Sequence, residues 1–261
     1  MTKSHLDNTD YCVVIPARYA SRRLPGKALQ DINGKTLLQH VWERAGQSAA
    51  REVIIATDDP RIERAAREFG ADVQMTDPNH TTGSDRIAEV VLKRRWNPGQ
   101  IVVNLQGDEP LMPSLCLDQV AALLSRHPQA DAATLFWPIK DEAELRSPNV
   151  VKVVLRADGS ALMFSRAVLP FARDFPSTAE ALAAGVKWRR HLGLYAYRAD
   201  SLLRFSGMPA GALEQVEQLE QLRYLESGGA IVLEQACMPI PAGVDTAADL
   251  ERVRKLISGK I

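Results

Sequence analysis

Residues 12–27 read CVVIPARYASRRLPGK, a buried strand followed by a basic loop. Residues 12–15 form an uninterrupted apolar run, which is typical of a strand covered on both faces of a sheet. The run ends at Pro16 and opens into a loop that holds four cations. These cations are Arg18, Arg22, Arg23 and Lys27. A loop of this charge at the carboxyl end of a strand favours phosphate binding over a plain solvated turn.

Strands and helices alternate along the chain after this loop. Further strands are predicted at residues 53–56, 72–75 and 101–105. Helices are predicted at residues 36–47, at residues 61–69 and from an N-cap at Ser84 onward. This alternation indicates an α/β fold with a mostly parallel sheet and helices on both faces.

The region of residues 131–199 has a different character, with several short strands and few helical patterns. It predicts a mixed-sheet insertion lobe with strands at 132–138, 150–155, 161–164 and 192–197. The chain then returns to the core with a helix at 214–227, a strand at 230–235 and a helix at 246–258. Thr246 and Asp249 resemble a capping box at the start of that final helix. We expect a single domain over 1–261. Its parts are a core at 1–130, the lobe at 131–212 and the return to the core at 213–261.

Composition excludes several classes of protein. The chain has 261 residues with 32 basic and 32 acidic side chains, and a formal net charge of zero disfavours a nucleic-acid-coating protein. Three cysteines without a CxxC pair fit neither a zinc knuckle nor a disulfide framework and indicate a reducing compartment. The N-terminus MTKSHLDNTD has no apolar core of a signal peptide, and no apolar run suffices to span a bilayer. We therefore expect a cytoplasmic protein without membrane insertion.

Two acidic positions are candidates for holding a divalent cation. Asp108 follows the predicted strand 101–105 within the segment QGDEP, and Asp245 precedes the last helix. Mg²⁺ commonly takes one or two protein carboxylates and completes its shell with water and phosphate oxygens. The segment around Asp108 is equally good turn composition, and Asp245 alone could simply complement the helix dipole.

Two further segments could contact a ligand. HTTGSDR at 80–86 ends at a predicted helix start, where backbone N–H groups could meet a nucleotide, or where a simple N-cap would suffice. RRHLGLY at 189–195 brings cations, an imidazole and a phenol to one strand, which favours binding of an acidic substrate. The segment GKT at 34–36 only imitates a P-loop, because Leu29 stands where its first glycine is required.

The chain as a whole resembles the 3-deoxy-manno-octulosonate cytidylyltransferase (CMP-KDO synthetase) family. The matching segments follow one another along almost the whole chain, and such an ordered set is specific. They are VVIPARYASRRLPGKALQDINGK, ATDD, HTTGSDRIAEV, VVNLQGDEPLMP, NVVKVV, FSRAVLP, RRHLGLYAYR, LEQLEQLR and GVDTAADLERVR. The resemblance implies a Rossmann-like nucleotidyltransferase core and a homodimer. CTP would bind mainly to residues 1–130, and the lobe at 131–212 would serve sugar binding and dimerisation. It also implies that CTP and the acid sugar KDO give CMP-KDO and pyrophosphate for lipopolysaccharide biosynthesis.

The resemblance also implies residue roles. Arg18 and Lys27 would bind the CTP phosphates, and Asp108 and Asp245 would ligate Mg²⁺. The cytidine would be held by Ala17, Ser84 and Gln106. The KDO pocket would be lined by Arg166, His191, Tyr195, Glu220 and Gln221, with the Arg166 guanidinium opposite the sugar carboxylate.

Four alternatives remain at this stage. The acceptor could be 8-amino-KDO or a nine-carbon sialic-type acid, or the enzyme could use a sugar 1-phosphate. A non-catalytic nucleotide sensor could also share the fold, although it would have little use for a metal poised for reaction. Small-molecule substrates are expected in every case, and no nucleic acid.

Overall fold

The computed structural model describes residues 9–21 and 23–259, so the prediction for Arg22 lies outside the described residues. One nine-stranded sheet runs through the molecule, with the principal order β11-β7-β10-β6-β1-β4-β5. The half of the sheet that is formed before residue 130 consists of parallel strands: β1 (Tyr11–Ala17), β4 (Glu52–Thr57), β5 (Asp72–Met75) and β6 (Ile101–Asn104). The expected α/β fold with a mostly parallel core is confirmed.

Side chains alternate across this sheet and build one core on each face. Val13 and Ile15 lie in the first core, whereas Val14 points into the second. The first core is covered by α1 (Leu37–Ala45), α2 (Pro60–Glu68), α4 (Ser114–Arg126) and α10 (Ala247–Ile257). The second is covered by α3 (Gly83–Arg94), α7 (Ala199–Ser206) and α9 (Leu222–Glu226). Three layers result, with the carboxyl ends of the parallel strands left free for a ligand.

The other half of the sheet is mixed, as predicted. The long strand β10 (Trp188–Arg198) runs antiparallel to both β6 and β7 (Ala132–Ile139), and β11 (Ile231–Gln235) is parallel to β7. The hairpin of β8 (Lys152–Leu155) and β9 (Ala161–Ser165) joins through β8. The strands of the expected lobe therefore continue the core sheet rather than form a separate one.

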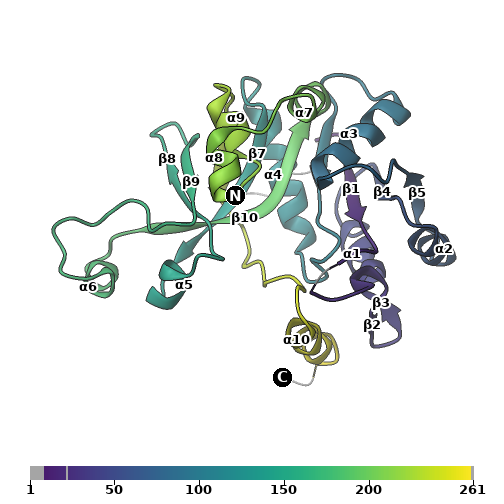
Figure 1. Cartoon of the computed structure of the whole chain (residues 1–261), viewed down its shortest axis with the longest axis horizontal. Helices are drawn as coiled ribbons and strands as arrows, with labels where there is room; N and C mark the ends of the chain where they lie inside the picture. Colours follow the sequence, from purple (N-terminus) through teal and green to yellow (C-terminus); the bar gives the residue numbers. More distant parts are fainter. Residues whose placement is uncertain (1–8, 22, 260–261) are drawn as a thin grey trace.

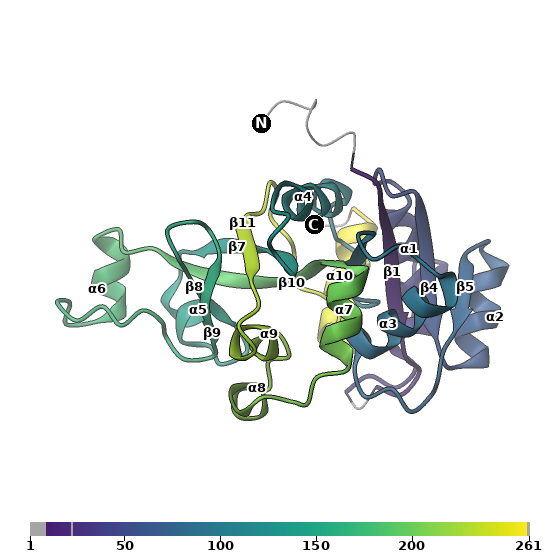
Figure 2. The same cartoon turned by 90° about the horizontal axis from the view of Figure 1, so that it is seen from above.

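The far end of this half carries a small third core. Trp188 and Leu145 are buried there, between the short helices α5 (Glu142–Arg146) and α6 (Thr178–Ala183). Figures 1 and 2 show α5 and α6 at one end of the molecule and α2 at the other. Within residues 9–21 and 23–259, no helix has both the length and the apolar character needed to cross a membrane.

Two local predictions were wrong. The helix expected over 214–227 is two helices, α8 (Ala212–Glu217) and α9, because Gln218 adopts a left-handed conformation with φ of 54° and ends the first of them. Ser84 does not cap α3; the hydroxyl of Thr82 accepts the N–H of Asp85 and is the N-cap. The capping box of Thr246 and Asp249 before α10 is confirmed.

Several elements had no counterpart in the sequence prediction. Besides α4, α5, α6 and α7, these are the turn η2 (Lys27–Leu29) and the two-residue strands β2 (Asp31–Ile32) and β3 (Lys35–Thr36). The turn follows Gly26, whose φ of 63° is costly for a residue with a Cβ. It closes the basic loop and turns Lys27 back toward the ends of the parallel strands.

Candidate active site

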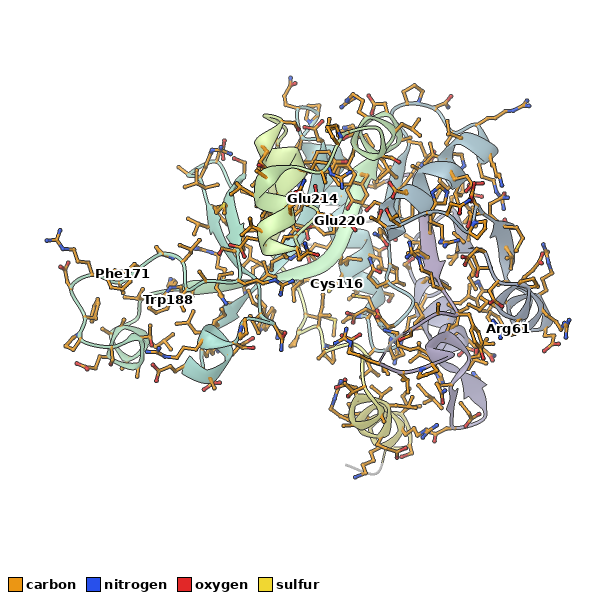
Figure 3. The ribbon with its side chains drawn as sticks, viewed as in Figure 1. Arg61, Cys116, Phe171, Trp188, Glu214 and Glu220 are labelled. Carbon is orange, nitrogen blue, oxygen red and sulfur yellow. The ribbon has the colours of Figure 1, made fainter. Side chains whose placement is uncertain are left out.

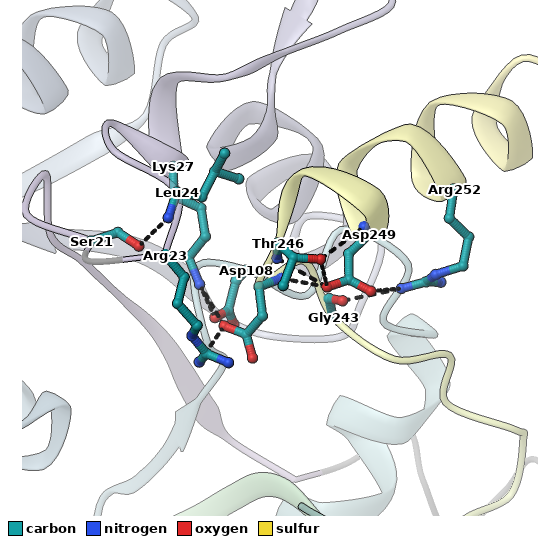
Figure 4. A network of polar contacts seen from close by, with 10 residues as sticks. Ser21, Arg23, Leu24, Lys27, Asp108, Gly243, Thr246, Asp249 and Arg252 are labelled. Atoms are coloured by element: carbon teal, nitrogen blue, oxygen red, sulfur yellow. Dashed lines mark hydrogen bonds and ion pairs between the residues drawn. The ribbon is translucent and has the colours of Figure 1, made fainter.

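Two aspartates from distant parts of the chain meet around one lysine. Lys27 Nζ lies 2.6 Å from Asp108 Oδ2 and 3.2 Å from Asp245 Oδ1, and Arg23 Nη2 lies 3.0 Å from the same Asp245 oxygen. Figure 4 shows Lys27 reaching from the basic loop toward Asp108. A backbone hydrogen bond of 2.8 Å from Val244 N to Asp108 O holds the two acidic segments side by side.

The charges in this cluster depend on one another. Desolvation alone would lower the pKa of Lys27, but Asp108 and Asp245 outweigh it and raise that pKa. The neighbouring Glu109 was not singled out by the sequence analysis. Burial, followed by repulsion from Asp108 and Asp245, raises its pKa to about 8, so the Glu109 carboxyl is mostly neutral at pH 7. Glu109 therefore adds little negative charge to the cluster at pH 7.

These two carboxylates fit a hard divalent cation. They already converge on one cationic group, the Lys27 ammonium, and their side chains are 30% and 48% exposed. Among the described residues no group of three or more His, Cys, Asp or Glu side chains could hold a metal. A pair of carboxylates beside an open space is nevertheless the usual protein share of a Mg²⁺ shell, with water and phosphate oxygens supplying the rest.

A cavity of about 240 Å³ lies against this cluster. Its wall contains Arg18, Lys27 and Asp108, and Ala17 and Gln106 lie beside them. The Nη2 group of Arg18 is buried without a hydrogen-bond partner among the described residues. A buried guanidinium N–H costs free energy unless an acceptor satisfies it, so this cavity is suited to an anion such as phosphate.

The floor of this cavity requires a glycine at position 107. A Cβ built on Gly107 would lie 2.9 Å from the backbone oxygen of Pro16, in strand β1. We expect Gly107→Ala to lower the free energy of unfolding by about 1–3 kcal/mol, the usual cost of overpacking. Urea denaturation measures this change. Gly99→Ala is the matched control, because a Cβ there meets nothing within 4 Å; equal losses in both variants would contradict the close approach.

A second cavity of about 320 Å³ adjoins the first, and Gly83 and Gln106 line both. Of the residues predicted for the sugar pocket, the second cavity is lined by His191, Tyr195, Glu220 and Gln221. The Tyr195 hydroxyl is buried without a hydrogen-bond partner among the described residues, so it can bind a polar group of a ligand. The sequence analysis missed Asn104, Tyr197 and Tyr224 in this wall. Nothing in the sequence assigns the two tyrosines to a binding site, because buried tyrosines are also common in ordinary hydrophobic cores.

A bulge in β10 brings His191 and Tyr195 together. Pairing with β7 shifts between Leu192 and Tyr195, and the two rings lie 5.2 Å apart. The Thr134 hydroxyl lies 2.9 and 2.8 Å from the carbonyl oxygens of Leu192 and Leu194. It therefore donates its single proton there and accepts from His191 Nε2 at 3.1 Å.

The expectation that His191 assists an acidic substrate is refined by this environment. Desolvation lowers the pKa of His191 to about 3, so the ring is neutral at pH 7. With Nε2–H donated to Thr134, Nδ1 is a hydrogen-bond acceptor. His191 can therefore accept a hydrogen bond from a sugar hydroxyl, but it does not supply a positive charge to a carboxylate.

Two predicted site residues lie elsewhere than expected. Ser84 lines the second cavity rather than the first, and its hydroxyl donates to Glu220 Oε2 at 3.0 Å. Arg166 is not among the residues that line either cavity. Its guanidinium donates to the carbonyl oxygens of Glu217, Pro148 and Gln218 instead, at 2.7, 2.9 and 3.4 Å.

Comparisons with known proteins agree on a single family. The family model described as Cytidylyltransferase matches residues 12–235. A relative from Pseudomonas fluorescens (strain SBW25), named 3-deoxy-manno-octulosonate cytidylyltransferase, is 53% identical over 250 residues, which are 95% of this chain and 98% of the relative. A relative of the same name from Pseudomonas syringae pv. tomato is 52% identical over 248 residues, with the same shares covered.

Solved structures extend the comparison to the fold. A CMP:2-keto-3-deoxy-manno-octonic acid synthetase complexed with CTP matches with a TM-score of 0.88 and 41% identity, over 97% of this chain and all of that chain. A 4-diphosphocytidyl-2C-methyl-D-erythritol synthase, 15% identical, matches with a TM-score of 0.62 over 96% of this chain and 99% of its own. The second likeness concerns the fold alone.

Proposed function

Because the chain belongs to the cytidylyltransferase family, we propose that it joins CTP to 3-deoxy-manno-octulosonate (KDO), giving CMP-KDO and pyrophosphate. The observation that carries this proposal is the pair of adjoining cavities that share Gly83 and Gln106. The first is cationic and suits a triphosphate, and the second is lined by hydroxyl, amide and imidazole groups that suit a polyhydroxylated sugar. The two substrates would meet at the shared wall.

The nucleotide belongs in the first cavity. Arg18, with its unpaired N–H, and Lys27 would neutralise the phosphates, while Ala17 and Gln106 would contact the cytidine side. Asp108 and Asp245 would hold Mg²⁺, which when bound supplies positive charge to the phosphate oxygens and lowers the pKa of a nearby hydroxyl. The chain offers this cation two carboxylates and leaves the remaining positions to substrate and water.

The acid sugar belongs in the second cavity. Tyr195 and Gln221 offer hydrogen-bond donors, His191 offers an acceptor through Nδ1, and the Ser84–Glu220 pair can bind hydroxyls. Arg166 stays a candidate for the sugar carboxylate only if its guanidinium leaves the carbonyl oxygens it now contacts. We therefore assign the recognition of the sugar first to the residues that already line the cavity.

Transfer requires positioning and charge neutralisation from this chain. The anomeric hydroxyl oxygen of the sugar forms a bond to the α-phosphorus as the bond to the pyrophosphate oxygen breaks, and the hydroxyl proton leaves to solvent. Lys27 and Arg18 stabilise the negative charge that accumulates on the leaving pyrophosphate. The cavity walls hold the two reacting groups in line, which removes most of the entropic cost of their encounter.

An acceptor panel tests this function. The protein is incubated with CTP and, in turn, KDO, 8-amino-KDO, a nine-carbon sialic acid and a sugar 1-phosphate, each with Mg²⁺ or with EDTA, and pyrophosphate is measured. We expect release with KDO and loss of release with EDTA. Binding of CTP without pyrophosphate from any acceptor would identify a nucleotide sensor instead. Preference for another acceptor would correct the substrate.

We also propose a homodimer, in which residues 131–212 supply the contacts as well as part of the sugar site. Support comes from Phe171, a large apolar side chain that is 81% exposed at the far end of this region (Figure 3). Light scattering on a sizing column measures the mass and decides between one and two copies. A cytoplasmic location stays part of the proposal and is consistent with the free thiols of Cys12, Cys116 and Cys237.

The basic loop is ordered from outside by Arg61. The Arg61 guanidinium carbon lies 3.3 Å from the centre of the Tyr19 ring, and Asp59 holds the same guanidinium at 2.7 and 2.9 Å. We expect Arg61→Ala to raise KM for CTP about two- to five-fold, the factor for a cation–π contact at an exposed site, with kcat unchanged. Arg64→Ala, an exposed position on the same helix, is the control. An unchanged KM in Arg61→Ala would show that the loop orders without the stack.

A further inference from the structure

Two cysteines that are distant in sequence lie face to face where α4 meets the segment after β11. Cys116 Sγ and Cys237 Sγ are 3.8 Å apart, although 121 positions separate them along the chain. Cys116 is fully buried in the first turn of α4 (labelled in Figure 3), whereas Cys237 is exposed just after β11. The two sulfurs are thus in van der Waals contact, with one accessible to solvent and the other beneath it.

A single buried side chain keeps the two sulfurs together. The Gln119 amide, one turn along α4 from Cys116, accepts the Cys237 N–H at 2.7 Å. Its NH₂ group donates to Gln235 O and Glu234 Oε1, both at 2.8 Å. These three hydrogen bonds fix the backbone around Cys237 to the helix that carries Cys116, so the contact is built into the fold and does not depend on flexible side chains alone.

We propose that Cys116 and Cys237 form a redox-active pair that closes to an intramolecular disulfide when the folded protein meets a small-molecule disulfide. The Cys237 thiolate attacks one sulfur of that disulfide, forms a mixed disulfide and releases one small thiol. The Cys116 sulfur, having lost its proton to solvent, then attacks Cys237 Sγ and releases the second small thiol. Two cysteines are oxidised and one small disulfide is reduced to two thiols, so electrons balance.

The geometry requires only a local adjustment. A disulfide bond is about 2.05 Å long, so the sulfurs must approach by roughly 1.8 Å, which rotation about χ1 of the exposed Cys237 can supply in large part. Burial raises the pKa of Cys116 to about 12, which agrees with its role as the second, slower nucleophile. Cys12 offers no comparable chemistry, because its Sγ is near Arg51 and Glu52 rather than another sulfur.

Formation of the Cys116–Cys237 disulfide would link α4 covalently to the segment that carries Asp245. Asp245 lies eight residues after Cys237. Two hydrogen bonds hold the backbone between them: Ile240 O accepts from Arg190 Nη2 in the sheet at 3.1 Å, and Val244 N donates to Asp108 O. The disulfide would therefore be a redox-dependent covalent link between α4 and the segment that leads to Asp245. This inference rests on the two sulfurs and is independent of the proposed function.

The test uses the folded full-length protein with oxidised glutathione at pH 8, then alkylation of free thiols, intact mass and peptide mapping. We expect loss of two of the three thiols, a mass decrease equal to two hydrogen atoms, and a peptide linking Cys116 to Cys237. Cys12→Ser should keep this product. Cys237→Ser, at an exposed position, should abolish it while the circular dichroism spectrum stays unchanged.

Two results would overturn the proposal. One is a stable glutathione adduct on Cys237 with Cys116 still free, which would show that the buried sulfur cannot reach its neighbour. The other is a Cys237–Cys237 link between chains on a non-reducing gel. Oxidation of protein unfolded in urea serves as a reference, since it should give mixed pairings that include Cys12.

Discussion

Replacing Asp108 with asparagine is expected to lower kcat about 10²–10³-fold at saturating CTP, KDO and Mg²⁺, the loss measured when one charge-stabilising group is removed from an active site. The substitution keeps the shape of the side chain and removes its negative charge. Asp108 is the carboxylate closest to Lys27, at 2.6 Å, and it lies in the wall of the phosphate cavity. Steady-state release of pyrophosphate measures the change.

Asp200→Asn is the matched control for this variant. Asp200 pairs with Arg204 on the surface of α7 and lines neither cavity. The kcat of the Asp200→Asn variant should therefore equal that of the parent. Both proteins should unfold at the same urea concentration as the parent, because the lost ion pairs are partly solvated. A near-normal kcat for Asp108→Asn would defeat the assignment of Asp108 to the reaction.

Lys27→Met is expected to lower kcat/KM for CTP by a similar factor, about 10²–10³-fold. The variant removes the ammonium that would face the leaving pyrophosphate and leaves Asp108 and Asp245 without their common cation. The fold should tolerate the change with a loss below about 1 kcal/mol, since both carboxylates are partly exposed and can be rehydrated. Initial rates at varied CTP and fixed KDO give the ratio.

Lys35→Met provides the same substitution away from the site. Lys35 pairs with Glu43 at 2.8 Å, and neither cavity contains it. We expect normal kinetics for this control. If Lys27→Met bound CTP and turned over like Lys35→Met, the basic loop would be a solvated turn, which was the alternative considered from the sequence.

The parallel half of the sheet was predictable because its signals are local. An apolar run and a basic loop each depend on a few neighbouring residues, and parallel topology follows from the alternation of strands and helices. The meeting of Asp108 and Asp245 was predictable only through the family resemblance. No sequence spacing predicts that two residues so far apart in the chain meet, because only the topology of the sheet brings them together.

The sugar side was less predictable because its determinants are tertiary. The left-handed Gln218 that divides α8 from α9 has no sequence signal of its own, since glutamine is an ordinary helix residue. The carbonyl oxygens that accept hydrogen bonds from Arg166 come from the end of α8 and from the loop after α5, which are distant in sequence. Likewise, Cys116 and Cys237 looked unrelated along the chain, and only packing of α4 against β11 makes them neighbours.

The continuity of the sheet limits how this molecule can change shape on meeting its substrates. Strand β10 is hydrogen-bonded to β6 at one end and to β7 along most of its length. A hinge between the two halves would have to break these ladders, so rigid-body rotation of one half against the other is disfavoured. Any adjustment to bound substrates should instead come from peripheral segments outside these ladders, namely the basic loop and the short helix α8.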